Sequence, residues 1–89
     1  MDLSQTFYQG DYRQVLVETL DCVEPRVPVE SAHLVVGALS FVGRWDELGQ
    51  LMETTPWDDV APVNYSEARF YQALGMVRHS CYVSGARLM

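Results

Sequence analysis

The chain has 89 residues, 48% of them hydrophobic, which suits one folded domain over residues 1–89 and excludes a disordered chain. Its 12 acids, six arginines and absence of lysine give a net charge of −6, which disfavours binding to a phosphate backbone. The longest apolar run, residues 34–42, falls far short of the roughly 20 residues that span a bilayer.

The N-terminal segment and the cysteines indicate the cellular compartment. Residues 1–5 contain neither the basic residues nor the apolar stretch of a secretion signal. Cys22 and Cys81 are too few and too far apart in the sequence to suggest a disulfide framework. We therefore expect a cytoplasmic protein.

Charge is unevenly distributed along the chain. Residues 1–67 carry all 12 acids and three arginines, a net charge of −9, whereas residues 68–89 carry three arginines and no acid. The positive end could favour an acidic partner. The alternative interpretation is a few solvated arginines on one helix.

Turn residues divide the chain into short helical segments. Breaks are expected at Gly10, at residues 25–28, at Gly43 and at residues 56–62, where glycine or proline occurs. Between the breaks, apolar residues recur with helical spacing over residues 12–23, 29–42, 45–52 and 65–84. The final run is expected to end at a glycine cap, Gly85. We predict an all-α fold with at least five helices and no strands.

A weak internal repeat relates two segments of the chain. The segments Phe7-Tyr8-Gln9-Gly10-Asp11-Tyr12 and Phe41-Val42-Gly43-Arg44-Trp45 superimpose at a spacing of 33 residues. Each places an aromatic residue two positions after a glycine that ends a helix. Ala68, Tyr71, Leu74 and Gly75 supply a third, partial copy.

These motifs resemble the tetratricopeptide-repeat superfamily, whose repeat is about 34 residues long. The order of helices is also similar to the coatomer epsilon subunit and to small chaperones of type III secretion needle subunits. The resemblance implies a short solenoid of antiparallel helix pairs, about two and a half pairs here. In such a fold Tyr12 and Trp45 would each be wedged between the helices of their own pair. Val35-Val36 stands where the family has Leu-Gly, which is a departure from its pattern.

Patterns for chemistry are absent from the sequence. Cys22, His33, His79 and Cys81 lack the paired spacing of a zinc site, and both cysteines fall on apolar stripes, where a thiol packs as a small hydrophobe. There is no nucleophile motif and no phosphate-binding loop, and neither histidine has an evident carboxylate partner in the sequence. We therefore predict no metal, no cofactor and no enzymatic activity.

A role in protein binding is the remaining prediction, either as an adaptor or as a chaperone. The resemblance implies that the first helices of the pairs line a concave groove that binds a helix or an extended segment of another polypeptide. When the groove positions of the family are aligned with this sequence, the resemblance implies that the lining residues are Phe7, Glu30, His33, Gly37, Ser40, Phe41, Arg69, Gln72, Met76 and His79. In this arrangement Gly37 would leave room for a partner side chain. The alternative is a helix-turn-helix nucleic-acid-binding regulator, whose recognition helix would be residues 65–82.

The last helix carries two apolar stripes, about 100° apart. One consists of Phe70, Ala73, Leu74, Val77 and Cys81, and the other of Ala68, Tyr71, Gly75, Arg78 and Tyr82. A complete repeat would cover one stripe with a second helix, but only four residues follow Gly85. We expect the cover to be a partner, preferably an acidic amphipathic helix, or a second copy or further chain. Tyr71, Leu74 and Arg78 are the contact residues expected here.

Trp57 lies in the Pro56–Pro62 loop and has two interpretations. Its ring could cap the ends of neighbouring helices, or it could be an exposed aromatic anchor for a partner.

Overall fold

Five α-helices, and no strand, make up the part of the chain that is described by a computed structural model, which covers the backbone of residues 3–88 and the side chains of residues 3–78. The all-α prediction is therefore confirmed for these residues. The helices are α1 (Leu3–Tyr8), α2 (Tyr12–Thr19), α3 (Ala32–Val42), α4 (Trp45–Thr54) and α5 (Pro62–Leu88), with 3-10 turns at Val29–Ser31 and Trp57–Asp59.

The helix breaks occur where the sequence predicts them. Gly10 and Gly43 have φ angles of 87° and 82°, a left-handed conformation that glycine adopts without steric cost. Asp11 caps α2, because its side chain accepts a hydrogen bond from the backbone N–H of Gln14. Pro62 occupies the first position of α5, where its missing N–H costs nothing.

Two helix ends differ from the prediction. α2 stops at Thr19, because the backbone N–H groups of residues 20 and 21 both bond to Leu16 O and close the helix. Val23 and Cys22 are consequently exposed in the following loop, so the expected buried position of Cys22 was wrong. α5 begins at Pro62 and continues past Gly85, where a cap was expected, to Leu88. One glycine inside a helix costs only about 1 kcal/mol, which a long helix can tolerate.

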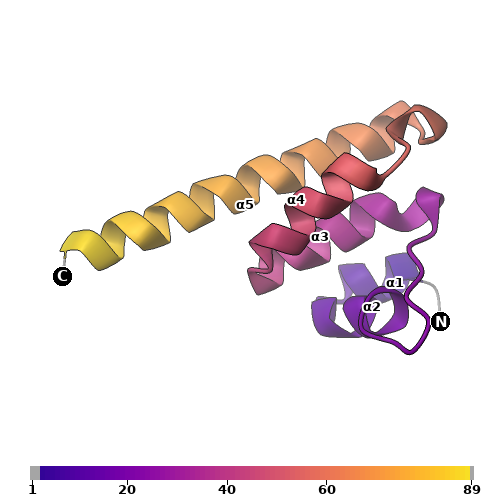
Figure 1. The fold of residues 1–89 in the computed structure, drawn as a ribbon, viewed down its shortest axis with the longest axis horizontal. Coiled ribbons are helices and arrows are strands. Elements are labelled where there is room, and N and C mark those ends of the chain that lie inside the picture. Colours follow the sequence, from indigo (N-terminus) through magenta and orange to yellow (C-terminus); the bar gives the residue numbers. More distant parts are fainter. Residues whose placement is uncertain (1–2, 89) are drawn as a thin grey trace.

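α3 is the central helix of the molecule. It packs against α5, α2, α4 and α1, and residues 32–40 are all buried, as its nearly continuous apolar sequence predicts. Figure 1 shows α1 and α2 below α3, α4 beside it, and α5 running across the top. Apart from α3, the core includes Phe7, Val15, Leu16, Leu48, Ala68 and Tyr71.

Two helical glycines allow aromatic rings to lie against the helix backbone. A Cβ atom placed on Gly37 of α3 would come within 2.7 Å of the Phe7 ring and 3.0 Å of the Tyr71 ring. A Cβ atom on Gly75 of α5 would lie 2.7 Å from the Trp45 ring. Trp45 therefore reaches across to α5, beyond the helix pair in which it was expected to be wedged. Tyr12 stacks on Phe41 of α3, with ring centroids 4.5 Å apart.

Replacing Gly37 by alanine should destabilise the protein by about 1–3 kcal/mol, because the added methyl group overlaps the buried Phe7 ring. Gly49 of α4 is the matched control, since nothing lies within 4 Å of an added Cβ there. Gly49→Ala should stabilise the protein by up to about 1 kcal/mol through helix propensity alone. Urea unfolding of both variants measures the two changes; destabilisation of equal size would show that the ring contact at Gly37 is unimportant.

Candidate functional site

One side of α5 is buried against the rest of the molecule. Ala68, Tyr71 and Gly75, which form one of the two stripes in the sequence, are buried, and α5 makes its most extensive contacts with α3. The hydroxyl of Tyr71 donates a hydrogen bond of 2.7 Å to Glu67 one helical turn earlier. Tyr71 is thus covered by the protein itself, and not by an external partner as expected.

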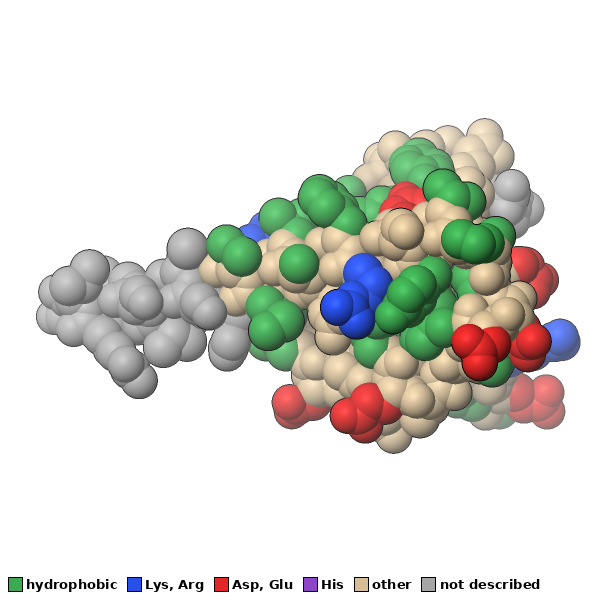
Figure 2. All heavy atoms as spheres, turned by 90° about the horizontal axis from the view of Figure 1, so that it is seen from above, with side chains coloured by type: hydrophobic (Ala, Val, Ile, Leu, Met, Phe, Trp, Pro, Cys, Tyr) green, Lys and Arg blue, Asp and Glu red, His purple; other side chains and the backbone are tan. Residues whose placement is uncertain are grey.

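The opposite side of α5 is open and apolar. We call Val63, Phe70, Ala73 and Val77 the α5 outer face; the three large side chains have exposed fractions of 72%, 63% and 60%. Their spacing of three, four and seven residues aligns them along one side of the helix. Figure 2, which looks down onto α5, shows hydrophobic side chains gathered over this part of the surface. Such a face can pack against another apolar surface.

The C-terminal part of α5 projects beyond the other helices. α5 has 27 residues, a length of about 40 Å, and the longest dimension of the molecule is 42 Å. In Figure 1 its yellow end extends well past α3 and α4. Met76, Val77 and Arg78, at the base of this projection, are all exposed. These three exposed side chains are open to contact with another molecule.

Two arginines lie on either side of the α5 outer face. Arg69 and Arg78 are displaced from Phe70 by about 100° in one direction and about 80° in the other. The guanidinium of Arg78 lies 5.5 Å from the centre of the Phe41 ring, and that of Arg69 lies 6.0 Å from the centre of the Tyr65 ring. Both side chains are exposed, and both can pair with acids of a molecule that lies along the face.

Four of the residues predicted to line a groove are instead part of the core. Phe7, His33, Gly37 and Ser40 are buried, and the room expected at Gly37 is filled by the Phe7 ring. The Ser40 hydroxyl faces Gly75 and has no hydrogen-bond partner among the described residues. These positions serve the packing of α3 against α1 and α5.

Glu67 joins three elements, a role that the sequence analysis missed. Its carboxylate accepts hydrogen bonds from the hydroxyls of Tyr8 on α1 and Tyr71 on α5, and lies 3.8 Å from Nε2 of His33 on α3. His33 therefore has a carboxylate neighbour after all. The spacing of four residues between Glu67 and Tyr71 was the only available signal. Contact with the carboxylate raises the pKa of the Tyr8 hydroxyl.

The other predicted contact residues do not form a single groove. Glu30 is exposed in the turn before α3, while Phe41 and Leu74 are half-buried. Gln72 and Met76 meet Trp45, Leu48 and Gly49 around a pocket of about 240 Å³ between α4 and α5. The side chain of His79 lies outside the described residues.

Trp57 caps the end of a neighbouring helix, which is the first of the two interpretations of this residue. Its indole N–H donates a 2.8 Å hydrogen bond to the carbonyl of Met52 in the last turn of α4, and its ring packs near Tyr65. It thus caps α4 and links it to the start of α5.

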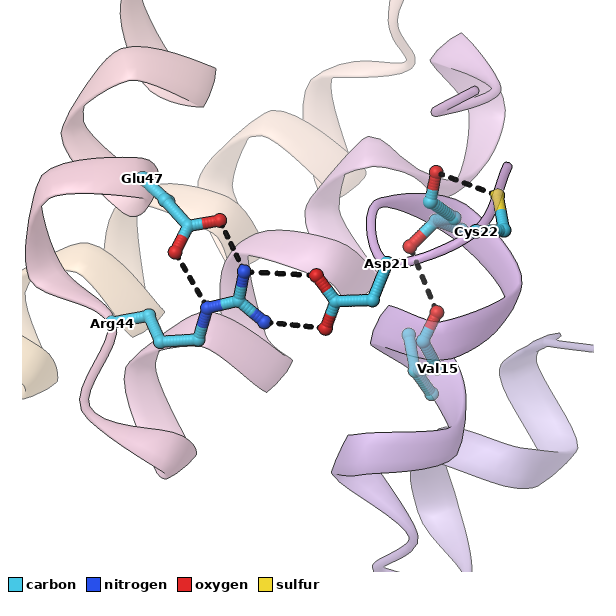
Figure 3. A network of polar contacts seen from close by, with 6 residues as sticks. Val15, Asp21, Cys22, Arg44 and Glu47 are labelled. Atoms are coloured by element: carbon cyan, nitrogen blue, oxygen red, sulfur yellow. Dashed lines mark hydrogen bonds and ion pairs between the residues drawn. The ribbon is translucent and has the colours of Figure 1, made fainter. Parts of the chain in front are cut away.

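Arg44, which precedes α4, is shared by two carboxylates. It forms paired hydrogen bonds of 2.6 and 3.0 Å with Asp21 and a second pair with Glu47 (Figure 3). The bonds to the guanidinium lower the pKa of the Asp21 carboxyl. Because one guanidinium bonds to two carboxylates, the network has a net negative charge. The network also joins the end of α2 to the start of α4.

Metal binding finds no support within the described part of the chain, where no three His, Cys, Asp or Glu side chains come together. The side chain of Cys81 lies outside this part.

None of the described helices is long and apolar enough to cross a membrane. Comparison with protein families, with curated proteins and with solved structures finds no match to the chain.

Lowering the pH should reduce the free energy of unfolding, because His33 becomes protonated. Burial lowers the pKa of this side chain below its usual value near 6.5, and the nearby Glu67 only partly opposes the shift. Because the folded pKa lies below the unfolded one, the stabilising contribution is complete above about pH 6.5 and is lost as pH falls through the folded pKa. Urea unfolding at pH 7.5 and 5 should show a smaller loss of stability for His33→Gln than for the parent. An identical pH dependence of the two proteins would contradict this account.

Proposed function

We propose that this protein is a non-catalytic protein-interaction module, an adaptor or chaperone, whose α5 outer face binds an acidic amphipathic helix of another polypeptide in the cytoplasm. The observation that carries the proposal is the exposure of Phe70 and Val77 on one side of a projecting helix. Aromatic and large apolar side chains of this kind contribute most of the binding energy at protein interfaces. Arg69 and Arg78, beside them, suit the acids of such a partner.

The contacts between helices support a helix-pair arrangement similar to tetratricopeptide repeats. α3 packs on α4, the next helix along the chain, and also on α2 and α5 on either side. α1 packs on both α2 and α3. In the proposed assignment, α1 with α2 and α3 with α4 are the first two pairs, and α5 is the first helix of a third. A partner helix on α5 would occupy the place of the helix that completes this pair.

Changing Phe70 and Val77 together to glutamate should abolish capture of the partner while leaving the fold intact, because both side chains are exposed. For a partner isolated with the parent protein from its native cell, affinity should fall at least about 30-fold, since each anchor contributes about 1 kcal/mol or more. The matched control is Val17→Glu with Val23→Glu, two exposed apolar residues away from α5. Unchanged affinity of the α5 variant, measured by calorimetry, would rule out this face as the binding site.

Retention on heparin resin separates this proposal from a helix-turn-helix nucleic-acid-binding protein. With a net charge of −6, the protein should flow through the resin at low salt, because affinity for a polyanion depends on neutralising its charges. Retention that weakens as salt is added would favour the nucleic-acid-binding alternative.

A further inference from the structure

A concave surface lies between α4 and the segment that connects α2 to α3. We call it the acidic groove; it has a volume of about 380 Å³ and is lined by Leu20, Val27, Val29, Glu47, Gln50, Leu51, Thr54, Thr55 and Pro56. Leu20, Val27 and Leu51 are partly buried and pack against the core, so they form an apolar floor. Glu47, Gln50 and Thr54 come from α4 and lie on one side of that helix.

The segments that form the acidic groove hold most of the negative charge. Residues 18–30 contain four acids and one arginine, and residues 44–59 contain five acids and one arginine. Nine of the 12 acids of the chain therefore lie in these two segments, with a combined net charge of −7. Glu47 is the one acid among the lining residues, and Arg44 is shared between it and Asp21. Glu30 and Glu53, both exposed, adjoin the lining residues Val29 and Thr54 in the chain. An apolar occupant with basic residues at its edges would match this surface.

The α5 outer face has the complementary properties. Residues 68–88 carry three arginines and no acid, and Arg69 and Arg78 lie beside the exposed Phe70 and Val77. These two anchors are seven residues apart, about 10.5 Å along the helix. Glu47 and Thr54, which mark the extent of α4 along the groove, are separated by the same seven residues. The α4 side of the groove and the α5 outer face therefore extend over the same number of helical residues, and the segments that carry them have opposite net charge.

We propose that the acidic groove of one molecule binds the α5 outer face of a second copy of this chain, in a head-to-tail manner. This inference rests on the proposed function, because it makes a second copy one of the polypeptides that the α5 outer face binds. The two surfaces are different, so each molecule offers one donor helix and one acceptor groove. Such contacts are heterologous and build rings or open chains instead of closing in a symmetric pair.

Sedimentation of two complementary variants tests the arrangement. Gln50→Arg with Thr54→Arg adds positive charge at exposed positions of the groove, and Phe70→Glu with Val77→Glu disrupts the α5 outer face. The parent should associate with increasing concentration at about 50 mM salt and at least tenfold more weakly at about 500 mM. Each variant alone should be monomeric. An equimolar mixture should form a one-to-one dimer that grows no further. The groove variant supplies the intact α5 outer face and the α5 variant supplies the intact groove, so no further binding surface remains.

Gln5→Arg with Gln9→Arg is the matched control, because both residues are exposed at α1, away from the groove, and add the same charge. It should associate like the parent. A monomeric parent at low salt, an associating groove variant, or a mixture that stays monomeric would overturn the inference. The proposed function would still stand if the parent were monomeric while the α5 variant alone lost the polypeptide captured from the cell.

Discussion

Aromatic rings can lie against the backbone of α3 and α5 only where the helix carries no side chain. Gly37 accepts the Phe7 ring and approaches Tyr71, and Gly75 accepts the ring of Trp45. These contacts hold α1 close to α3 and α4 close to α5, so that α3 can be buried along nearly its whole length. Any larger side chain at Gly37 would push these elements apart, and the surfaces they form would change with them.

The same packing determines which side of α5 faces solvent. When Ala68, Tyr71 and Gly75 turn toward α3, Phe70 and Val77 must turn outward, because the two stripes lie on different sides of the helix. An apolar stripe on a projecting helix is a surface that another polypeptide can cover. The proposed function therefore follows from how the core is built, and not from a separate motif.

Charge gives the molecule two unlike ends. Arg44 bonds to both Asp21 and Glu47, which joins the end of α2 to α4 and leaves an excess of acid beside the acidic groove. Beyond Glu67 the chain has only basic charges. Surfaces of opposite charge on one small protein would set the direction in which the proposed partners, including a second copy, approach it.

The sequence by itself determined the helical class and the breaks at Gly10, Gly43 and Pro62, because glycine and proline act through local backbone geometry. It also identified both apolar stripes of α5, since helical spacing alone reveals them. Only the tertiary structure decided that Tyr71 is buried and Phe70 exposed, because that choice depends on where α3 lies. Likewise, Glu67 contacts His33 and Tyr8, which lie 34 and 59 positions earlier in the sequence. No local sequence pattern encodes contacts over such separations.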